Sequence, residues 1–198
     1  MNEINSESIY EDIIFNQTQL EEKSLENITF DNCIFEDANF YKSIFSDCKF
    51  FNCKFIRSDL SLVKLPNSVI DNTLFQECKI QGINFTTLNW DKNISSNPLS
   101  FTNSQISYCS FNALKLKKLK IKNCIANDLD FSDCILTYSD FSGSDLKGSR
   151  FNNCKLNNSD FTKTKNYYIN PVLNKLDGSK FTYPEVINLL DSFNIKIQ

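Results

Sequence analysis

Large apolar side chains recur at every fifth position along most of this 198-residue chain, and we call each such position a centre. Two frames of centres, offset by one residue, contain all of the 18 phenylalanines except Phe51 and Phe193. The first frame has its centres at Phe15, Leu20, Leu25, Phe30, Phe35, Phe40, Phe45, Phe50, Phe55, Leu60, Leu65, Ile70, Phe75, Ile80, Phe85 and Trp90. The second has them at Phe101, Ile106, Phe111, Leu116, Ile121, Ala126, Phe131, Leu136, Phe141, Leu146, Phe151, Leu156 and Phe161, and again at Phe181. A period of five matches neither an amphipathic helix nor a long strand, so we expect short extended pieces separated by corners.

The residue two positions before a centre is small or apolar, as in Cys33, Ala38 and Ser58. Residues two apart in extended backbone share a face, so both should point inward and the residue between them outward. The two residues after a centre are mostly Ser, Asn, Asp, Lys or Gly, which are typical of turns. Each repeat is therefore predicted to be a short strand followed by a turn. Successive coils should then stack about 4.8 Å apart, the usual strand spacing.

The segments SDFSGSDLKGSRF (139–151) and NCKLNNSDF (153–161) resemble the pentapeptide-repeat family, whose motif is often written A-(D/N)-L-x-x. The resemblance covers nearly the whole chain. It implies an all-β fold, a right-handed quadrilateral parallel β-helix of about 20 residues per coil. About eight coils would form a rod on the order of 40 Å long.

Residues 1–198 are accordingly expected to form a single domain, with repeats at about 15–90 and 101–165. The frame breaks at 91–100, where two alternatives stay open: a single-residue bulge, or a loop of about six residues that replaces one repeat. The break is either a tolerated insertion or a loop that contacts a partner. For the second case the candidate partner-binding residues are Asp91, Lys92 and Asn93.

The C-terminal residues predict a cap for the last coil. Residues 166–181 are expected to form a degenerate last coil, because Phe161 and Phe181 are one coil's length of 20 residues apart, and a short α-helix should follow at about 183–193. Thr182 and Glu185 have capping-box spacing and Pro184 suits a first helical turn. One helix face would carry Val186, Leu189, Leu190 and Phe193. A repeat array needs such a cap, and the family resemblance adds a homodimer contact at this end.

The residue types argue against an enzyme. The chain has no histidine, only four glycines and no phosphate-binding glycine motif, so we expect no catalytic residues and no cofactor. All eight cysteines lie two positions before a centre, which makes them small buried residues. We therefore expect no metal site. We also expect no disulfide, although Cys33 and Cys53, like Cys134 and Cys154, should stack on adjacent coils.

Charge is distributed unevenly. Residues 1–40 contain ten carboxylates and one lysine, whereas the remaining residues contain 20 basic and 14 acidic side chains. The segment 114–122 places five lysines on the surface, where they form either a solubilising patch or a nucleic-acid patch. We expect no direct nucleic-acid binding, no membrane span and a cytoplasmic location.

The resemblance also implies a function. Qnr-like members of the family bind DNA gyrase or topoisomerase IV and protect these type II topoisomerases from quinolones or peptide toxins. Their acidic rods are thought to mimic DNA. The acidic start of this chain agrees with that role, but its mildly basic remainder does not. The alternative is a generic protein-interaction scaffold with an unrelated partner.

Overall fold

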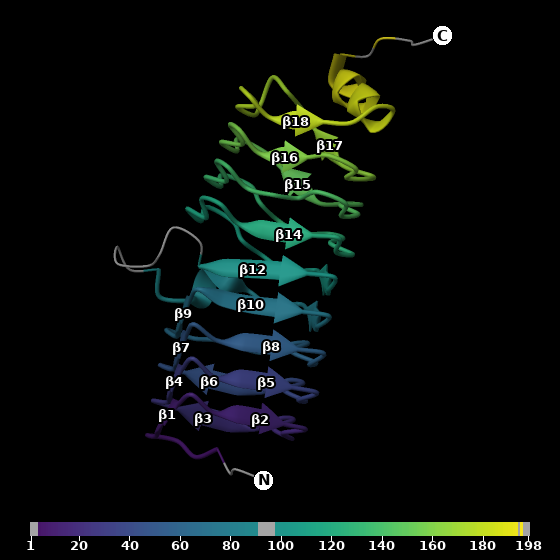
Figure 1. The fold of residues 1–198 in the computed structure, drawn as a ribbon. Helices are drawn as coiled ribbons and strands as arrows, with labels where there is room; N and C mark the ends of the chain where they lie inside the picture. Colours follow the sequence, from purple (N-terminus) through teal and green to yellow (C-terminus); the bar gives the residue numbers. More distant parts are fainter. Residues whose placement is uncertain (1–3, 91–97, 194, 196–198) are drawn as a thin grey trace.

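The computed structural model describes residues 4–90, 98–193 and 195 of the chain. These residues wind into a parallel β-solenoid of about eight turns, with the two ends of the chain at opposite ends of the rod (Figure 1). Each coil has four sides, and the strands pair in parallel with strands of neighbouring coils. Most paired residues are 20 apart in sequence, as in Phe30 and Phe50, so four five-residue repeats complete one coil.

Four columns of strands and single bridges form the four faces. Face 1 contains β1 (Ile9–Glu11), β4 (Thr29–Asp31), β7 (Lys49–Phe51) and β9 (Val69–Asp71). Face 2 contains β2 (Ile14–Asn16), β5 (Ile34–Glu36), β8 (Lys54–Ile56), β10 (Thr73–Gln76), β12 (Leu99–Thr102), β14 (Lys120–Lys122), β16 (Asp160–Phe161) and β18 (Lys180–Phe181). Face 3 contains β11 (Lys79–Gln81) and β13 (Gln105–Ser107). Face 4 contains β3 (Ser24–Glu26), β6 (Ile44–Ser46), the 3-10 turn η1 (Phe85–Thr87), β15 (Arg150–Phe151) and β17 (Tyr168–Ile169).

The corners follow from the residues after each centre. The second residue after a centre adopts a left-handed backbone, as Asn32 and Asn52 do with φ of 51° and 55°. Asparagine and aspartate tolerate this conformation better than other non-glycine residues, which explains their frequency there. Gly148 occupies one such corner at φ 72°, where an added Cβ would collide with the Asp128 carboxylate stacked on it.

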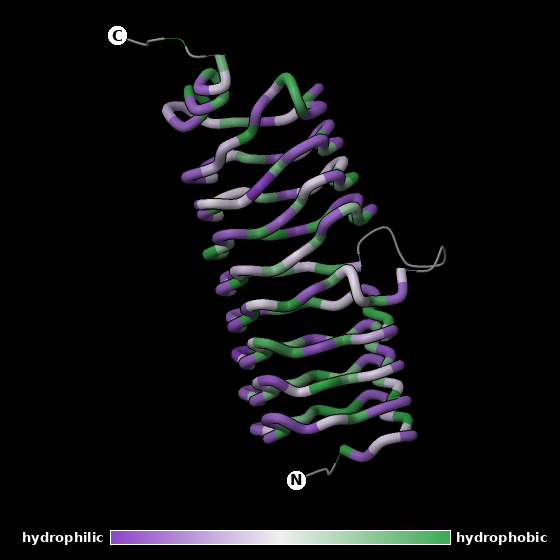
Figure 2. Tube along the Cα trace, turned by 180° about the vertical axis from the view of Figure 1, so that it is seen from behind, coloured by the Kyte–Doolittle hydropathy of each residue, from purple (hydrophilic) through white to green (hydrophobic). Residues whose placement is uncertain are grey.

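Centres fill the interior, as predicted. On face 2, Phe15, Phe35, Phe55, Phe75 and Phe101 form one continuous stack with ring centroids 4.7 to 5.1 Å apart. All five rings are buried. Apolar and polar residues alternate along every coil in Figure 2 because side chains in extended backbone point inward and outward in turn.

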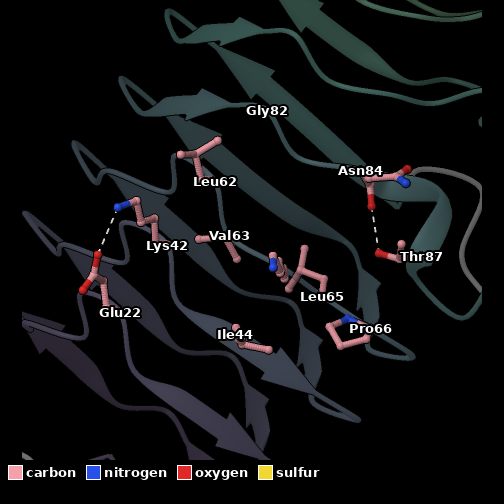
Figure 3. Close-up of a pocket in the computed structure, with 11 residues that line it drawn as sticks. Glu22, Lys42, Ile44, Leu62, Val63, Leu65, Pro66, Gly82, Asn84 and Thr87 are labelled. Atoms are coloured by element: carbon pink, nitrogen blue, oxygen red, sulfur yellow. Dashed lines mark hydrogen bonds and ion pairs between the residues drawn. The ribbon is translucent and has the colours of Figure 1, made fainter.

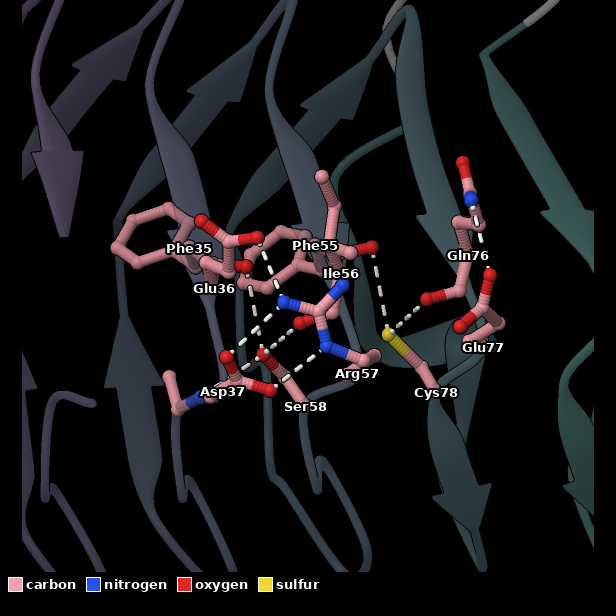
Figure 4. A network of polar contacts seen from close by, with 11 residues as sticks. Phe35, Glu36, Asp37, Phe55, Ile56, Arg57, Ser58, Gln76, Glu77 and Cys78 are labelled. Atoms are coloured by element: carbon pink, nitrogen blue, oxygen red, sulfur yellow. Dashed lines mark hydrogen bonds and ion pairs between the residues drawn. The ribbon is translucent and has the colours of Figure 1, made fainter. Parts of the chain in front are cut away.

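Cysteine, serine and threonine occupy the inward position two residues before a centre, where they bridge coils. Ser58 donates its hydroxyl to the carbonyl of Phe35 at 3.3 Å and accepts from the backbone N–H of Ala38 at 3.1 Å. Cys78 directs its thiol at the carbonyl of Phe55 in the same way (Figure 4). A short polar side chain therefore satisfies backbone groups that the corners would otherwise leave buried and unpaired.

The frame break lengthens one coil. Asn89 N donates to Ser68 O, 21 residues back, the same offset that links Lys49 to Ile28. Beyond the break Phe101 pairs with Phe75, 26 residues back instead of 20. Six additional residues thus enter the coil while all four sides are kept, so no repeat is replaced.

The last coil is irregular and is followed by a helix. β17 pairs with β15 at an offset of 18, and Tyr167 fills the small inward position with a large ring. The predicted helix is present as η2 (Glu185–Phe193), but as a 3-10 helix rather than an α-helix. Ile187 N donates to Pro184 O, three residues back, and Val186, Ile187 and Asn188 are weak α-helix formers. Among the described residues no helix is long and apolar enough to cross a bilayer.

Candidate partner-binding surfaces

The three contact residues predicted in the frame break, Asp91, Lys92 and Asn93, lie outside the described residues. The flanking residues are placed. Trp90 is half-buried against the core, and its indole N–H donates to the Phe85 carbonyl at 2.9 Å. Pro98 is buried, and its carbonyl accepts from Thr73 N at 3.0 Å. Both ends of the insertion are therefore anchored on the solenoid.

The helix η2 covers only part of the C-terminal end. Leu189 is half-buried and packs on the core, and Val186 is also half-buried. Leu190 and Phe193 remain exposed, Phe193 to 49%. The structure therefore divides the predicted helix face into a capping part and a free apolar part.

Further apolar side chains are exposed on and directly after the last coil. Tyr168, Val172, Leu173 and Tyr183 are all more than half exposed. Beneath them Tyr167 is buried, and burial, with Glu185 nearby, raises the pKa of its hydroxyl to about 12. The last coil therefore exposes apolar side chains among charged ones, and the buried Tyr167 hydroxyl stays uncharged at neutral pH.

Carboxylates in the first coils are partly neutralised by basic residues of the next coil. Arg57 contacts Glu36 at 2.6 Å and Asp37 at 2.8 Å at the corner between faces 2 and 3 (Figure 4). The hydrogen bond from Arg57 lowers the pKa of Asp37. Lys42 pairs with Glu22 at 3.1 Å. The acidic character predicted for this end is therefore weakened on faces 2 and 3.

Face 1 keeps its acidic character through the first four coils. The parallel register aligns Glu11 with Asp31, then Phe51 and Asp71, so three carboxylates share one column. Asp12 and Asp47 occupy its neighbouring corners. These carboxylates give face 1 an acidic stripe, in which Lys49 is an exposed basic residue.

The same face becomes basic further along the rod. Register aligns Lys115, Ile135, Lys155 and Lys175 in one column, with the exposed Lys117 and Lys118 beside it. Of the five lysines at 115–122, Lys122 pairs with Asp140 at 3.0 Å. Leu116, Leu119 and Ile121 point inward as predicted, so the remaining lysines form an exposed basic patch.

The cysteines provide no reactive site. All eight are free, buried thiols. Burial raises the pKa of the Cys53, Cys109, Cys124 and Cys134 thiols to about 12. Thiols with such pKa values stay protonated at neutral pH and are poor nucleophiles and metal ligands. Within the described ranges no three His, Cys, Asp or Glu side chains gather in a way that could hold a metal ion.

A surface groove that sequence reasoning missed lies on face 4, beside η1. It has a volume of about 730 Å³ and a mostly apolar lining. Figure 3 shows Ile44, Leu62, Val63, Leu65 and Pro66 along it, with the Lys42–Glu22 pair at one edge. We call it the face-4 groove. The one sequence signal for it is Pro66, since proline is unusual inside a paired strand.

Comparisons with known proteins agree with this architecture. The family model described as the pentapeptide repeat region matches residues 23–96 and 95–161. No curated protein matches the sequence. Two trypsin-treated variants of QnrB1, a plasmid-mediated fluoroquinolone resistance protein, match with a TM-score of 0.62 at 19% identity. These matches cover 96% and 98% of this chain and 97% and 100% of QnrB1. Full-length QnrB1 matches at a TM-score of 0.58 and 20% identity over 94% of this chain and 100% of that chain. At these identities the likeness concerns the fold.

Proposed function

This chain belongs to the pentapeptide-repeat family, and we propose that it is a protein-binding rod that docks on a type II topoisomerase and catalyses no reaction. The observation that carries the proposal is the end-to-end match to QnrB1, a fluoroquinolone resistance protein, over 96% of this chain. In this proposal the rod protects DNA gyrase or topoisomerase IV from quinolones or toxins, and it acts in the cytoplasm.

The acidic stripe of face 1 supports DNA mimicry. Glu11, Asp31 and Asp71 lie in one straight column over four coils, each coil displaced by the usual strand spacing of about 4.8 Å. This column, in which Phe51 separates two of the carboxylates, presents negative charge along one face of the rod. It would steer the rod toward a positively charged DNA-binding surface. The first four coils are therefore the part assigned to the topoisomerase.

The insertion supplies the second proposed contact. Asp91, Lys92 and Asn93 come directly after Trp90 in the one coil that is six residues longer than the others, in which Phe75 still pairs with Phe101. Because the strand pairing of the solenoid is kept around this insertion, its residues can be used to recognise a partner. Replacing these three residues with Gly-Ser-Gly should weaken partner binding and leave the unfolding transition unchanged.

The basic half of face 1 favours a second candidate function. Lys115, Lys155 and Lys175 reverse the sign of the face, so the rod as a whole is no uniform DNA mimic. A scaffold that binds an unrelated partner with an acidic surface accounts for these lysines directly. In that case the acidic and basic halves would contact different parts of the partner.

A homodimer through the C-terminal end completes the proposal. Leu190, Phe193 and Tyr183 are exposed in or directly before η2, and joining two such ends would bury them. Val186 and Leu189 would stay in the cap beneath. Multi-angle light scattering at micromolar concentration tests this: Phe193→Asp should convert a dimer to a monomer. A monomeric mass for the unmodified protein would remove the dimer from the proposal.

The function is tested by a gyrase supercoiling assay with a fluoroquinolone, with and without the purified protein. Rescue of supercoiling is expected, and it should be lost in the double variant Glu11→Lys/Asp31→Lys. The matched control is Lys115→Glu/Lys155→Glu, which changes the same number of charges on the basic half of face 1. Absence of rescue by the unmodified protein would favour the scaffold. Rescue by the variant Glu11→Lys/Asp31→Lys would contradict DNA mimicry through face 1.

A further inference from the structure

The backbone ladder of face 4 has a gap beneath the groove. Below it, Lys64 N donates to Ser43 O and Phe45 N donates to Lys64 O, both at 2.9 Å. Above it, Phe85 N donates to Ser110 O at 2.9 Å. The same pattern would join Leu65 N to Asn84 O and Asn84 N to Val63 O. Neither bond is present in the described part of the chain.

The 3-10 turn η1 causes the gap. The Asn84 carbonyl accepts from the Thr87 hydroxyl at 2.8 Å, within its own turn, and the Asn84 side chain accepts from Thr86 N at 3.1 Å. Pairing between the coils continues on both sides, from Leu62 N to Gln81 O at 2.7 Å and from Asn67 N to Thr87 O at 2.9 Å. The opening is therefore one ladder step wide.

The gap presents the groups that one residue of a parallel strand would satisfy. Val63 C=O and Leu65 N–H are two residues apart, and in a parallel ladder a single partner residue bonds to both. Leaving such groups unpaired beneath apolar side chains is unfavourable. Behind them the core contains a small apolar void of about 20 Å³, bordered by Val63, Leu65 and Phe85. Such a void offers no polar partner that would hold a water.

The charge at the groove defines the side chain that would fit. In parallel pairing the partner residue lies next to Lys64, and its side chain points outward as that of Lys64 does. Lys64 is exposed and has no ion pair within the described residues, whereas Lys42 at the edge is held by Glu22. The exposed Leu62 and Pro66 lie on either side.

We propose that the face-4 groove binds a short extended segment of a partner polypeptide, in which an acidic residue pairs with Lys64 between apolar neighbours. The main chain of that residue takes the place of Asn84, donating to Val63 C=O and accepting from Leu65 N–H. Peptides that add to a sheet by main-chain hydrogen bonds use the same physics. The inference rests on the proposed role as a protein-binding rod, but it does not require that the partner be a topoisomerase.

The probe is the blocked peptide acetyl-Ala-Leu-Asp-Leu-Ala-amide, titrated into the ¹⁵N-labelled full-length protein and followed by NMR. We expect saturable shifts confined to the backbone amides of 62–67 and 82–87, with a Kd of about 1 mM. The same peptide methylated on the backbone nitrogen of Asp cannot donate to Val63 C=O, and should bind about tenfold more weakly.

Variants test the charge preference. Lys64→Glu should favour a peptide with Lys in place of Asp, whereas Lys54→Glu, an exposed lysine in the equivalent outward position on face 2, should change nothing. Equal binding of the methylated peptide, shifts spread over other faces, or no shifts up to about 10 mM peptide would each overturn the proposal. Because no topoisomerase is present, these results are independent of the supercoiling assay. If the protein rescues gyrase but does not bind the peptide, only the proposal for the face-4 groove is contradicted.

Discussion

The hydroxyl of Ser144 lies 2.7 Å from the carbonyl oxygen of Ile121, to which it donates a hydrogen bond between neighbouring coils. The Ser144 hydroxyl oxygen in turn accepts a hydrogen bond from the backbone N–H of Cys124 at 3.0 Å. Ser144 is buried, so one side chain satisfies a donor and an acceptor of the previous coil. The repeat therefore uses its small inward residue as a backbone partner as well as a spacer.

Ser144→Ala should destabilise the fold by about 1–3 kcal/mol, because the Ile121 carbonyl and the Cys124 N–H are then buried and unpaired. Ser144→Cys should cost less, since a thiol donates to a carbonyl of the previous coil at the same position in Cys134 and Cys154. Urea unfolding measures both. The half-buried Ser132 on the outer surface provides the control, and Ser132→Ala should stay within about 0.5 kcal/mol. An equal loss in both alanine variants would contradict the bridging role.

Phe35→Ala should cost about 3–5 kcal/mol, because it opens a cavity in the middle of the face-2 stack. The Phe35 ring lies between Phe15 at 5.1 Å and Phe55 at 4.7 Å. Phe51 is outside the repeat frame and only half-buried, so Phe51→Ala is the matched control. Thermal and urea unfolding should rank the two variants in this order. A loss at Phe51 as large as at Phe35 would show that the frame does not define the core.

Thiol reagents should fail to modify the folded protein at pH 8 and should count eight thiols after unfolding without reductant. Burial keeps thiols such as Cys109 protonated, with a pKa of about 12, and closed to reagent. Modification of the native protein should therefore proceed only at the rate at which the coils open. Fewer than eight thiols in the unfolded, unreduced chain would reveal a disulfide. A fast native fraction would show that a coil edge opens locally.

Arg57→Gln should raise the pKa of Asp37 toward the ordinary value of about 3.9. The pKa of Asp37 is lowered in the folded protein by the hydrogen bond from Arg57, so this contact stabilises the fold above the unfolded pKa. The contribution disappears as pH falls through the lower, folded pKa. Carboxyl-carbon NMR titration follows the change directly. Lys79→Gln, which removes the separate pair with Asp59, should leave the Asp37 titration where it is.

The repeat itself was predictable because its signal is local and repeated many times. The inward position of Phe30 or Phe141 can be predicted from the small residue two positions before it, and the turn can be predicted from the polar residues that follow. The helix at 185–193 was predicted from its capping residues, but its 3-10 form depends on hydrogen bonds such as Ile187 N to Pro184 O. The predicted apolar face was also split, because Leu189 reaches the core and Phe193 does not.

The face-4 groove had almost no sequence signal. Lys64 and Asn84 both stand one residue before a centre, as paired residues do elsewhere in the array. Their separation follows from the way Asn84 bonds to Thr86 and Thr87 instead of to the coil below. A competition between a local turn and a ladder bond 20 residues away is decided only when both coils are in place.

The amino-acid sequence by itself determined that this chain is a solenoid with phenylalanines inside and polar corners outside, since a five-residue period repeated along the chain admits no helix or long strand. The family resemblance implied four sides, and the 20-residue offset between paired strands shows them. Only the tertiary structure decided which centres stack, because an insertion shifts the pairing of Phe75 from the expected offset to Phe101. It also decided where Glu11 and Asp31 form a column and where the ladder opens above Lys64. These features depend on contacts between residues about one coil apart, and local patterns carry little information about them.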